Sequence, residues 1–133
     1  MIAGVADTHT AIWFLFGDPR LSTVAKAFID EAAAERRKIV LSPISLAEVI
    51  YLTEKNRIPA SAFGELAAAL SNANHVFAEA PFTVQVVQTM QQVSRDAVPD
   101  MPDRIVAATA LYLNVPLLSR DARIRASNVQ TIW

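Results

Sequence analysis

The sequence opens with Met1-Ile2-Ala3-Gly4-Val5-Ala6-Asp7, an uncharged and largely apolar run that ends in a carboxylate. A short apolar run of this kind is typical of a strand that is buried on both faces of a sheet. Two similar runs follow at Ile39–Leu41 and Val115–Leu118, and shorter candidates lie at Val76–Phe77 and Val129–Ile132. The sequence therefore predicts several short, buried strands.

Helical patterns separate these strands. The predicted helices carry apolar stripes or capping residues, and they cover Thr8–Phe16, Ser22 to about Arg37, Ser45–Lys55, Pro59 to about Leu70, Val84–Val93, Asp103–Leu113 and a short turn after Asp121. Short apolar strands that alternate with helices form a parallel sheet covered on both faces. We therefore predict an α/β fold, a three-layer α/β/α sandwich with a four- or five-stranded parallel sheet, in which residues 1–133 form a single domain.

The composition excludes several classes of protein. Hydrophobic residues make up 53% of the 133 residues and charged residues 19%, which indicates a packed globule. The absence of cysteine excludes disulfides and thiolate metal sites. No basic leader and no apolar run near the roughly 18 residues of a membrane span are visible, so we expect a cytoplasmic protein. A net charge of −1 argues against a protein whose only function is to bind nucleic acid, because such proteins usually carry a strong basic excess.

Four carboxylates follow predicted strands or lie on predicted helices. Asp7 follows the first strand, and Asp121 lies shortly after the strand Val115–Leu118. Glu48 and Asp103 lie on helices that could begin at the same edge of the sheet, where parallel sheets bind their ligands. Carboxylates that meet repel one another unless a divalent cation, such as Mg²⁺ or Mn²⁺, lies between them. The pattern therefore indicates a metal site suited to phosphodiester hydrolysis.

Helix capping explains the same residues in another way. Ser45 and Glu48 fit a capping box, and Asp7 and Asp121 are candidate N-caps, as are Asp100 or Asp103. A chain whose acidic residues were all caps would be a non-catalytic protein-binding module. Spacing alone leaves both interpretations open.

The four carboxylates lie in four segments that run along nearly the whole chain. These segments are VADTHTAIW (residues 5–13), LSPISLAEV (41–49), MPDRIVAATAL (101–111) and PLLSRD (116–121). In this order they resemble the motifs of PIN-domain ribonucleases, and most closely those of the toxins in VapBC-type toxin–antitoxin pairs.

The resemblance implies a PIN-like sandwich, an endoribonuclease that depends on Mg²⁺ or Mn²⁺, and neutralisation by a small antitoxin protein. It implies that the catalytic and metal-binding residues are Asp7, Glu48, Asp103 and Asp121. It implies supporting roles for Thr8, Ser45, Asp100 and Ser119. One departure is Val98-Pro99, because some relatives carry a histidine near the site at this point.

Other residues are candidates for contact with RNA or with a protein partner. Arg104 and Arg120 stand next to Asp103 and Asp121, two members of the quartet of carboxylates, and are candidates for phosphate contact with RNA. His9 could touch the substrate, but we rather expect it on the surface or in contact with the residues that form the site. Trp13 could stack on RNA bases, but we rather expect it in the core. The alanine-rich helix at Ala60–Leu70 is a candidate homodimer or antitoxin surface, although core packing explains it equally well.

Overall fold

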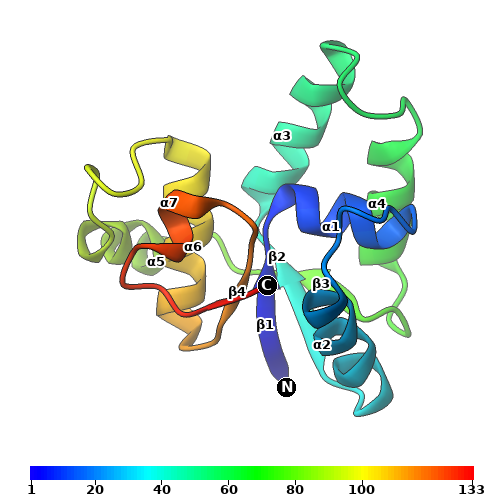
Figure 1. Cartoon of the computed structure of the whole chain (residues 1–133), viewed down its shortest axis with the longest axis horizontal. Coiled ribbons are helices and arrows are strands. Elements are labelled where there is room, and N and C mark those ends of the chain that lie inside the picture. The colour runs from blue at the N-terminus through cyan, green and yellow to red at the C-terminus, as the bar shows by residue number, and fades with distance from the viewer.

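In the computed structural model, which describes residues 1–133, five parallel strands form one sheet (Figure 1). The strands are β1 (Ile2–Ala6), β2 (Lys38–Leu41), β3 (Phe77–Glu79), β4 (Leu117–Leu118) and β5 (Thr131–Ile132). They lie in the order β3-β2-β1-β4-β5, so the first strand is central. The predicted α/β fold with a parallel sheet is confirmed, and the number of strands is five.

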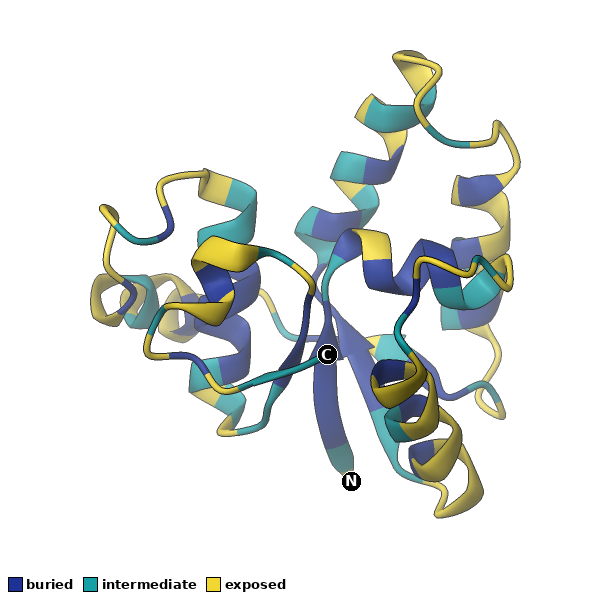
Figure 2. Ribbon diagram, in the orientation of Figure 1, coloured by how far each residue is buried: buried dark blue, intermediate teal, exposed yellow.

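Helices cover both faces of the sheet (Figure 2). The helical elements are α1 (Thr8–Leu15), α2 (Thr23–Ala34), α3 (Pro43–Glu54), α4 (Ala62–Ser71), α5 (Val84–Thr89), the 3₁₀ turn η1 (Met90–Gln92), α6 (Met101–Leu113) and α7 (Ala122–Arg125). Successive residues of β2 point to opposite faces: Ile39 and Leu41 join one core cluster with α1, α2 and α4, whereas Val40 joins another with α5, α6 and α7. No helix combines the length and the apolarity that crossing a membrane requires.

Helix α3 begins earlier than the sequence predicted. Its N-cap is Ser42, whose side chain accepts a hydrogen bond from the backbone N–H of Ile44 at 3.3 Å. Pro43 then occupies the first turn, where its missing N–H costs nothing. The capping box predicted for Ser45 and Glu48 is therefore wrong, and Glu48 lies in the second turn of the helix.

Two other helices end or divide before their predicted limits. The helix that Ser22 caps ends at Ala34 rather than near Arg37, because Arg36 adopts a left-handed conformation with φ of 57°. The helix predicted at Val84–Val93 is divided into α5 and the 3₁₀ turn η1. The buried face of α4 packs in the core, so ordinary packing accounts for its apolar stripe.

Gly4 in the central strand allows α2 and β4 to pack closely against β1. A Cβ atom at this position would lie 3.1 Å from Leu118 Cδ1, 3.1 Å from the carbonyl oxygen of Pro116 and 3.3 Å from Phe28 Cε1. We expect Gly4→Ala to lower the free energy of unfolding by about 1–3 kcal/mol, because overpacking forces neighbours apart. Urea denaturation measures this change.

Gly64 provides the matched control for this substitution. It lies exposed within α4, and a Cβ atom there would have no neighbour within 4 Å. Gly64→Ala should raise the free energy of unfolding by about 0.5–1 kcal/mol, because alanine is the better helix former. Equal effects of the two substitutions would contradict the packing explanation.

Candidate functional site

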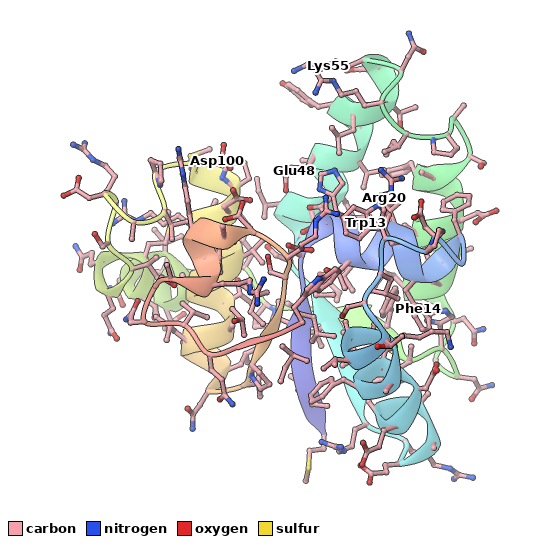
Figure 3. The ribbon with its side chains drawn as sticks, in the orientation of Figure 1. Trp13, Phe14, Arg20, Glu48, Lys55 and Asp100 are labelled. Atoms are coloured by element: carbon pink, nitrogen blue, oxygen red, sulfur yellow. The ribbon has the colours of Figure 1, made fainter.

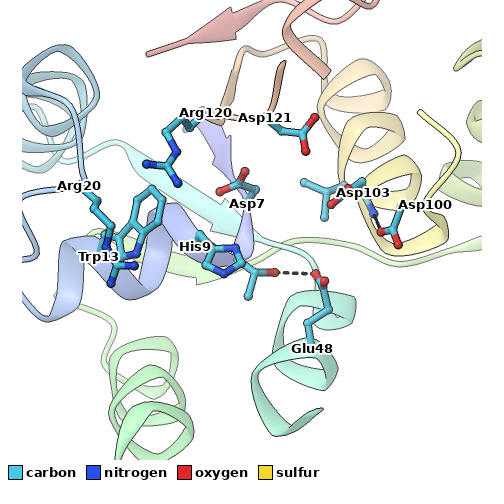
Figure 4. Close-up of a pocket in the computed structure, with 11 residues that line it drawn as sticks. Asp7, His9, Trp13, Arg20, Glu48, Asp100, Asp103, Arg120 and Asp121 are labelled. Atoms are coloured by element: carbon cyan, nitrogen blue, oxygen red, sulfur yellow. Dashed lines mark hydrogen bonds between the residues drawn. The ribbon is translucent and has the colours of Figure 1, made fainter. Parts of the chain in front are cut away.

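A cavity of about 480 Å³ lies beyond the carboxyl ends of β1 and β4. Its polar lining includes five carboxylates, two arginines and one histidine (Figure 4). The lining residues are Asp7, Thr8, His9, Trp13, Arg20, Glu48, Asp100, Asp103, Val106, Arg120 and Asp121. The structure thus brings all four members of the predicted quartet to one cavity.

Asp7 and Asp121 both follow strands and both cap helices. Asp7 Oδ1 accepts a hydrogen bond from the backbone N–H of Thr10 at 2.9 Å. Asp121 Oδ1 accepts from the N–H groups of Arg123 and Ile124, at 2.9 and 3.0 Å. The capping prediction is therefore confirmed for these two aspartates. Capping occupies only part of each carboxylate, and both side chains still face the cavity.

Glu48 reaches the cavity from the second turn of α3 and is held there by a hydrogen bond. Thr8 Oγ1, at the start of α1, donates to Glu48 Oε1 at 2.7 Å. Burial raises the pKa of Glu48, and the charges of Asp100 and Asp7 add to this effect, whereas the bond from Thr8 opposes it. Glu48 is thus a positioned carboxylate in an environment that disfavours its charge.

Asp103 lies in the first turn of α6 and does not cap the helix. The cap is Asp100, whose Oδ2 accepts a hydrogen bond from the backbone N–H of Asp103 at 3.1 Å. Burial raises the pKa of Asp103 from 3.8 to about 7, and the charges of Asp100, Asp121, Glu48 and Asp7 contribute to the increase, in that order. Neither Glu48 nor Asp103 is therefore explained by helix capping.

The closest grouping of carboxylates consists of Glu48, Asp100 and Asp103. One oxygen of each lies within 4.8 Å of the other two. Figure 3 shows that Glu48 projects from α3 and Asp100 from the start of α6. The donors are all carboxylate oxygens, the ligands that hard divalent cations prefer, and a cation would relieve the repulsion that adds to burial in raising the pKa of Asp103. These three residues could hold a metal ion, with Asp7 and Asp121 lining the same cavity.

The predicted supporting residues divide into two groups. Thr8 and Asp100 line the cavity, and Ser119 Oγ accepts a hydrogen bond from the backbone N–H of Asp121 at 3.1 Å. Ser45 lies on the buried face of α3 and does not line the cavity, and its hydroxyl has no hydrogen-bond partner.

The two arginines predicted to contact RNA lie in different places. Arg104 points away from the cavity, where its guanidinium donates to the carbonyl oxygens of Val93 and Met90 at 2.9 and 3.0 Å. Arg120 lines the cavity, with its guanidinium carbon 4.6 Å from the centroid of the Trp13 ring.

Arg20 is a cavity residue that sequence analysis missed. Its guanidinium carbon lies 5.1 Å from the centroid of the Trp13 ring. Asp18 holds it through two hydrogen bonds, and the Arg20 guanidinium lowers the pKa of Asp18 to about 2. The only sequence signal was the turn at Gly17-Asp18-Pro19, which marked the end of a helix and gave no sign that the next residue faces the carboxylates.

Comparisons with known proteins agree with this arrangement. The PIN domain family model matches residues 5–128. No curated protein matches the sequence. The fold resembles a chain in the crystal structure of VapBC2 from Rickettsia felis bound to a DNA fragment from their promoter, with a TM-score of 0.71 and 15% identity over 98% of this chain and 97% of that one. It also resembles a chain of FitAcB from Neisseria gonorrhoeae, with a TM-score of 0.60 and 19% identity over 96% and 95% of the two chains.

Proposed function

Because this chain belongs to the PIN domain family, we propose that it is an endoribonuclease that depends on Mg²⁺ or Mn²⁺. The observation that carries the proposal is the convergence of five carboxylates on one cavity, where burial and the charges of the other four raise the pKa of Asp103 to about 7. Such repulsion costs stability unless a cation offsets it, which favours a binding site over a set of helix caps. Residues 1–133 would form a single nuclease domain.

The carboxylates divide into two sets under this proposal. Glu48, Asp100 and Asp103 would hold the cation, and Asp7 and Asp121 would complete the acidic lining on the side of the strands. A bound divalent cation supplies positive charge that favours ionisation of a nearby water and offsets the charge developing on the phosphate. Water attacks phosphorus in line, the bond from phosphorus to O3′ breaks, and the products carry 5′-phosphate and 3′-hydroxyl ends.

Residues around the cavity orient Glu48 and set the protonation of Asp103 before a cation binds. Thr8 fixes the orientation of Glu48 through its 2.7 Å hydrogen bond, as residues behind a metal ligand commonly do. Near neutral pH, many metal-free molecules carry a proton on Asp103, because its pKa is about 7. Cation binding must release that proton, so affinity for the cation should rise as the pH rises to about 8.

We expect cleavage of single-stranded RNA by the purified chain when Mg²⁺ or Mn²⁺ is present, and none when EDTA is in excess. Mapping the product ends is decisive, because metal-dependent hydrolysis leaves 5′-phosphates, whereas a contaminating metal-independent ribonuclease leaves cyclic phosphates. Restoring the cation should restore cleavage. A chain that binds the cation yet leaves RNA intact would instead be the non-catalytic binding module.

The proposal extends to a partner. The similar structures come from VapBC2 and FitAcB, which are toxin–antitoxin complexes. By analogy this chain would be the toxin, neutralised by a small antitoxin protein, and it would form a homodimer. The exposed apolar side chains of Ile50 and Tyr51 on α3 and Phe63 on α4 offer a surface for such contacts.

A further inference from the structure

One side of the cavity carries positive charge around a single aromatic ring. The guanidinium carbons of Arg20 and Arg120 lie 5.1 and 4.6 Å from the centroid of Trp13, within the range of cation–π attraction. Figure 4 shows this cluster on the opposite side of Asp7 from Asp100 and Asp103. The cavity therefore has an acidic side and a basic side.

The Trp13 ring is a fixed support for the two arginines. Only 5% of Trp13 is exposed, and its ring packs against Trp133 and His9, with centroids 5.9 and 5.6 Å away. So little exposure leaves no face on which an RNA base could stack. The basic side of the cavity therefore suits contact with the RNA backbone, which does not depend on base identity.

The two arginines differ in whether a carboxylate offsets their charge. Arg20 forms an ion pair with Asp18, at 2.7 Å between Arg20 Nη2 and Asp18 Oδ2, so part of its charge is already offset. Arg120 is exposed and has no carboxylate within ion-pair distance and no hydrogen-bond partner for its guanidinium. Its five N–H donors are free, while the contact with Trp13 limits the directions in which they point.

We propose that Arg120 binds the phosphate next to the scissile one in a single strand of RNA, with the Trp13 ring orienting the Arg120 guanidinium. This inference rests on the proposed function, because the scissile phosphate would lie on the acidic side with the cation. Phosphates recur along one strand, so a second anion must lie near the first. A free guanidinium that is oriented by a ring is suited to bidentate contact with that phosphate.

RNA binding tests the proposal without requiring cleavage. The full chain carrying Asp103→Asn is mixed in Mg²⁺ with a short fluorescein-labelled single-stranded RNA, and Kd is measured over a range of salt concentrations. Adding Arg120→Gln should weaken binding about tenfold at low salt. It should also reduce the slope of log K against log salt by about 0.7, the value expected for one lost phosphate contact.

Two variants control this measurement. Arg36→Gln removes the same charge from an exposed residue just before β2, at the amino end of the strands and away from the cavity, and should leave the slope unchanged. Arg120→Lys keeps the charge but not the planar group, so it should retain the slope while binding less tightly than arginine. Thermal unfolding confirms that each variant is folded.

Cleavage identifies which phosphate Arg120 contacts. Once the cut site in an RNA oligonucleotide is mapped, an uncharged methylphosphonate replaces the phosphate on either side of it. At one of the two positions, the replacement should raise KM about tenfold in the otherwise unchanged chain and have no further effect in Arg120→Gln. If the methylphosphonate at either position raised KM in Arg120→Gln by as much as it does in the unchanged chain, the proposal would be overturned.

The outcomes separate this inference from the proposed function. If no RNA is cut with any cation, the nuclease proposal fails, and the salt slope still decides whether Arg120 contacts phosphate. If Arg120→Gln leaves both Kd and the slope unchanged, the inference is wrong. A loss of binding to a co-expressed protein partner in that same variant would then assign Arg120 to a protein interface.

Discussion

Asp7→Asn and Asp103→Asn are each expected to lower the rate of Mg²⁺-dependent RNA cleavage by about a thousandfold, with the chain still folded. Both side chains line the cavity, and both contribute negative charge that a cation requires. Initial rates on one RNA substrate, measured at saturating Mg²⁺, give the ratio directly.

Asp7→Asn separates the two explanations of Asp7, which are a carboxylate of the metal site and a helix cap. Asp7 caps α1 through a hydrogen bond from the backbone N–H of Thr10, and asparagine caps helices about as well as aspartate. The variant therefore keeps the cap and loses only the charge. If Asp7 acts only as a cap, activity will survive the substitution.

A carboxylate outside the cavity serves as the control for activity. Asp30 on α2 forms an exposed ion pair with Lys26, and such surface pairs contribute little. Asp30→Asn should cut RNA at the rate of the unchanged chain. Undiminished cleavage by either cavity variant would remove Asp7 or Asp103 from the catalytic residues.

The second large effect is on stability: Asp103→Asn should make the metal-free protein more stable at pH 8 by about 2 kcal/mol. The folded state raises the pKa of Asp103 from 3.8 to about 7, so between these values the folded chain binds more protons than the unfolded chain. The free energy of unfolding therefore falls as the pH rises from about 4 to about 7. The full change in pKa corresponds to about 4 kcal/mol, and partial exposure to solvent reduces it to about 2.

Urea denaturation in EDTA at pH 4.5 and pH 8 measures this effect. The two chains should differ little at the lower pH and most at the higher one, because asparagine does not ionise. Asp30→Asn controls for the loss of a carboxylate elsewhere. A destabilised Asp103→Asn chain at pH 8 in EDTA would mean that burial and the neighbouring carboxylates do not disfavour the charge of Asp103.

Adding Mg²⁺ should reverse the order of stability. The cation binds only the folded chain and stabilises it by about 2.7 kcal/mol at a concentration a hundred times its Kd. Asp103→Asn removes one of the three grouped carboxylates, so it should gain much less. Equal stabilisation of both chains would place the cation elsewhere.

The sequence alone determined the fold class and the edge at which the carboxylates gather. Apolar runs that are buried on both faces have few alternatives to a parallel sheet, and a charged residue directly after such a run must lie at the rim. Asp7 and Asp121 could be placed in this way because each is only a few residues from the end of its strand. The resemblance of four ordered segments to PIN-domain motifs added the family.

Only the tertiary structure decided which side chains share the cavity and how they are grouped there. Glu48, Asp100 and Asp103 form the closest set because α3 begins at Pro43 and α6 at Met101, and helix starts are weakly encoded.

Two arginines, one a predicted RNA contact and the other missed by sequence analysis, show the same limit. Arg104 follows Asp103 in sequence, yet neighbouring positions on a helix point in different directions, and its guanidinium turns toward η1. Arg20 lies far from the acidic motifs in sequence and reaches the cavity only because the loop after α1 folds back beside Trp13. The direction of a side chain depends on how its element packs against the others, and local sequence does not contain that information.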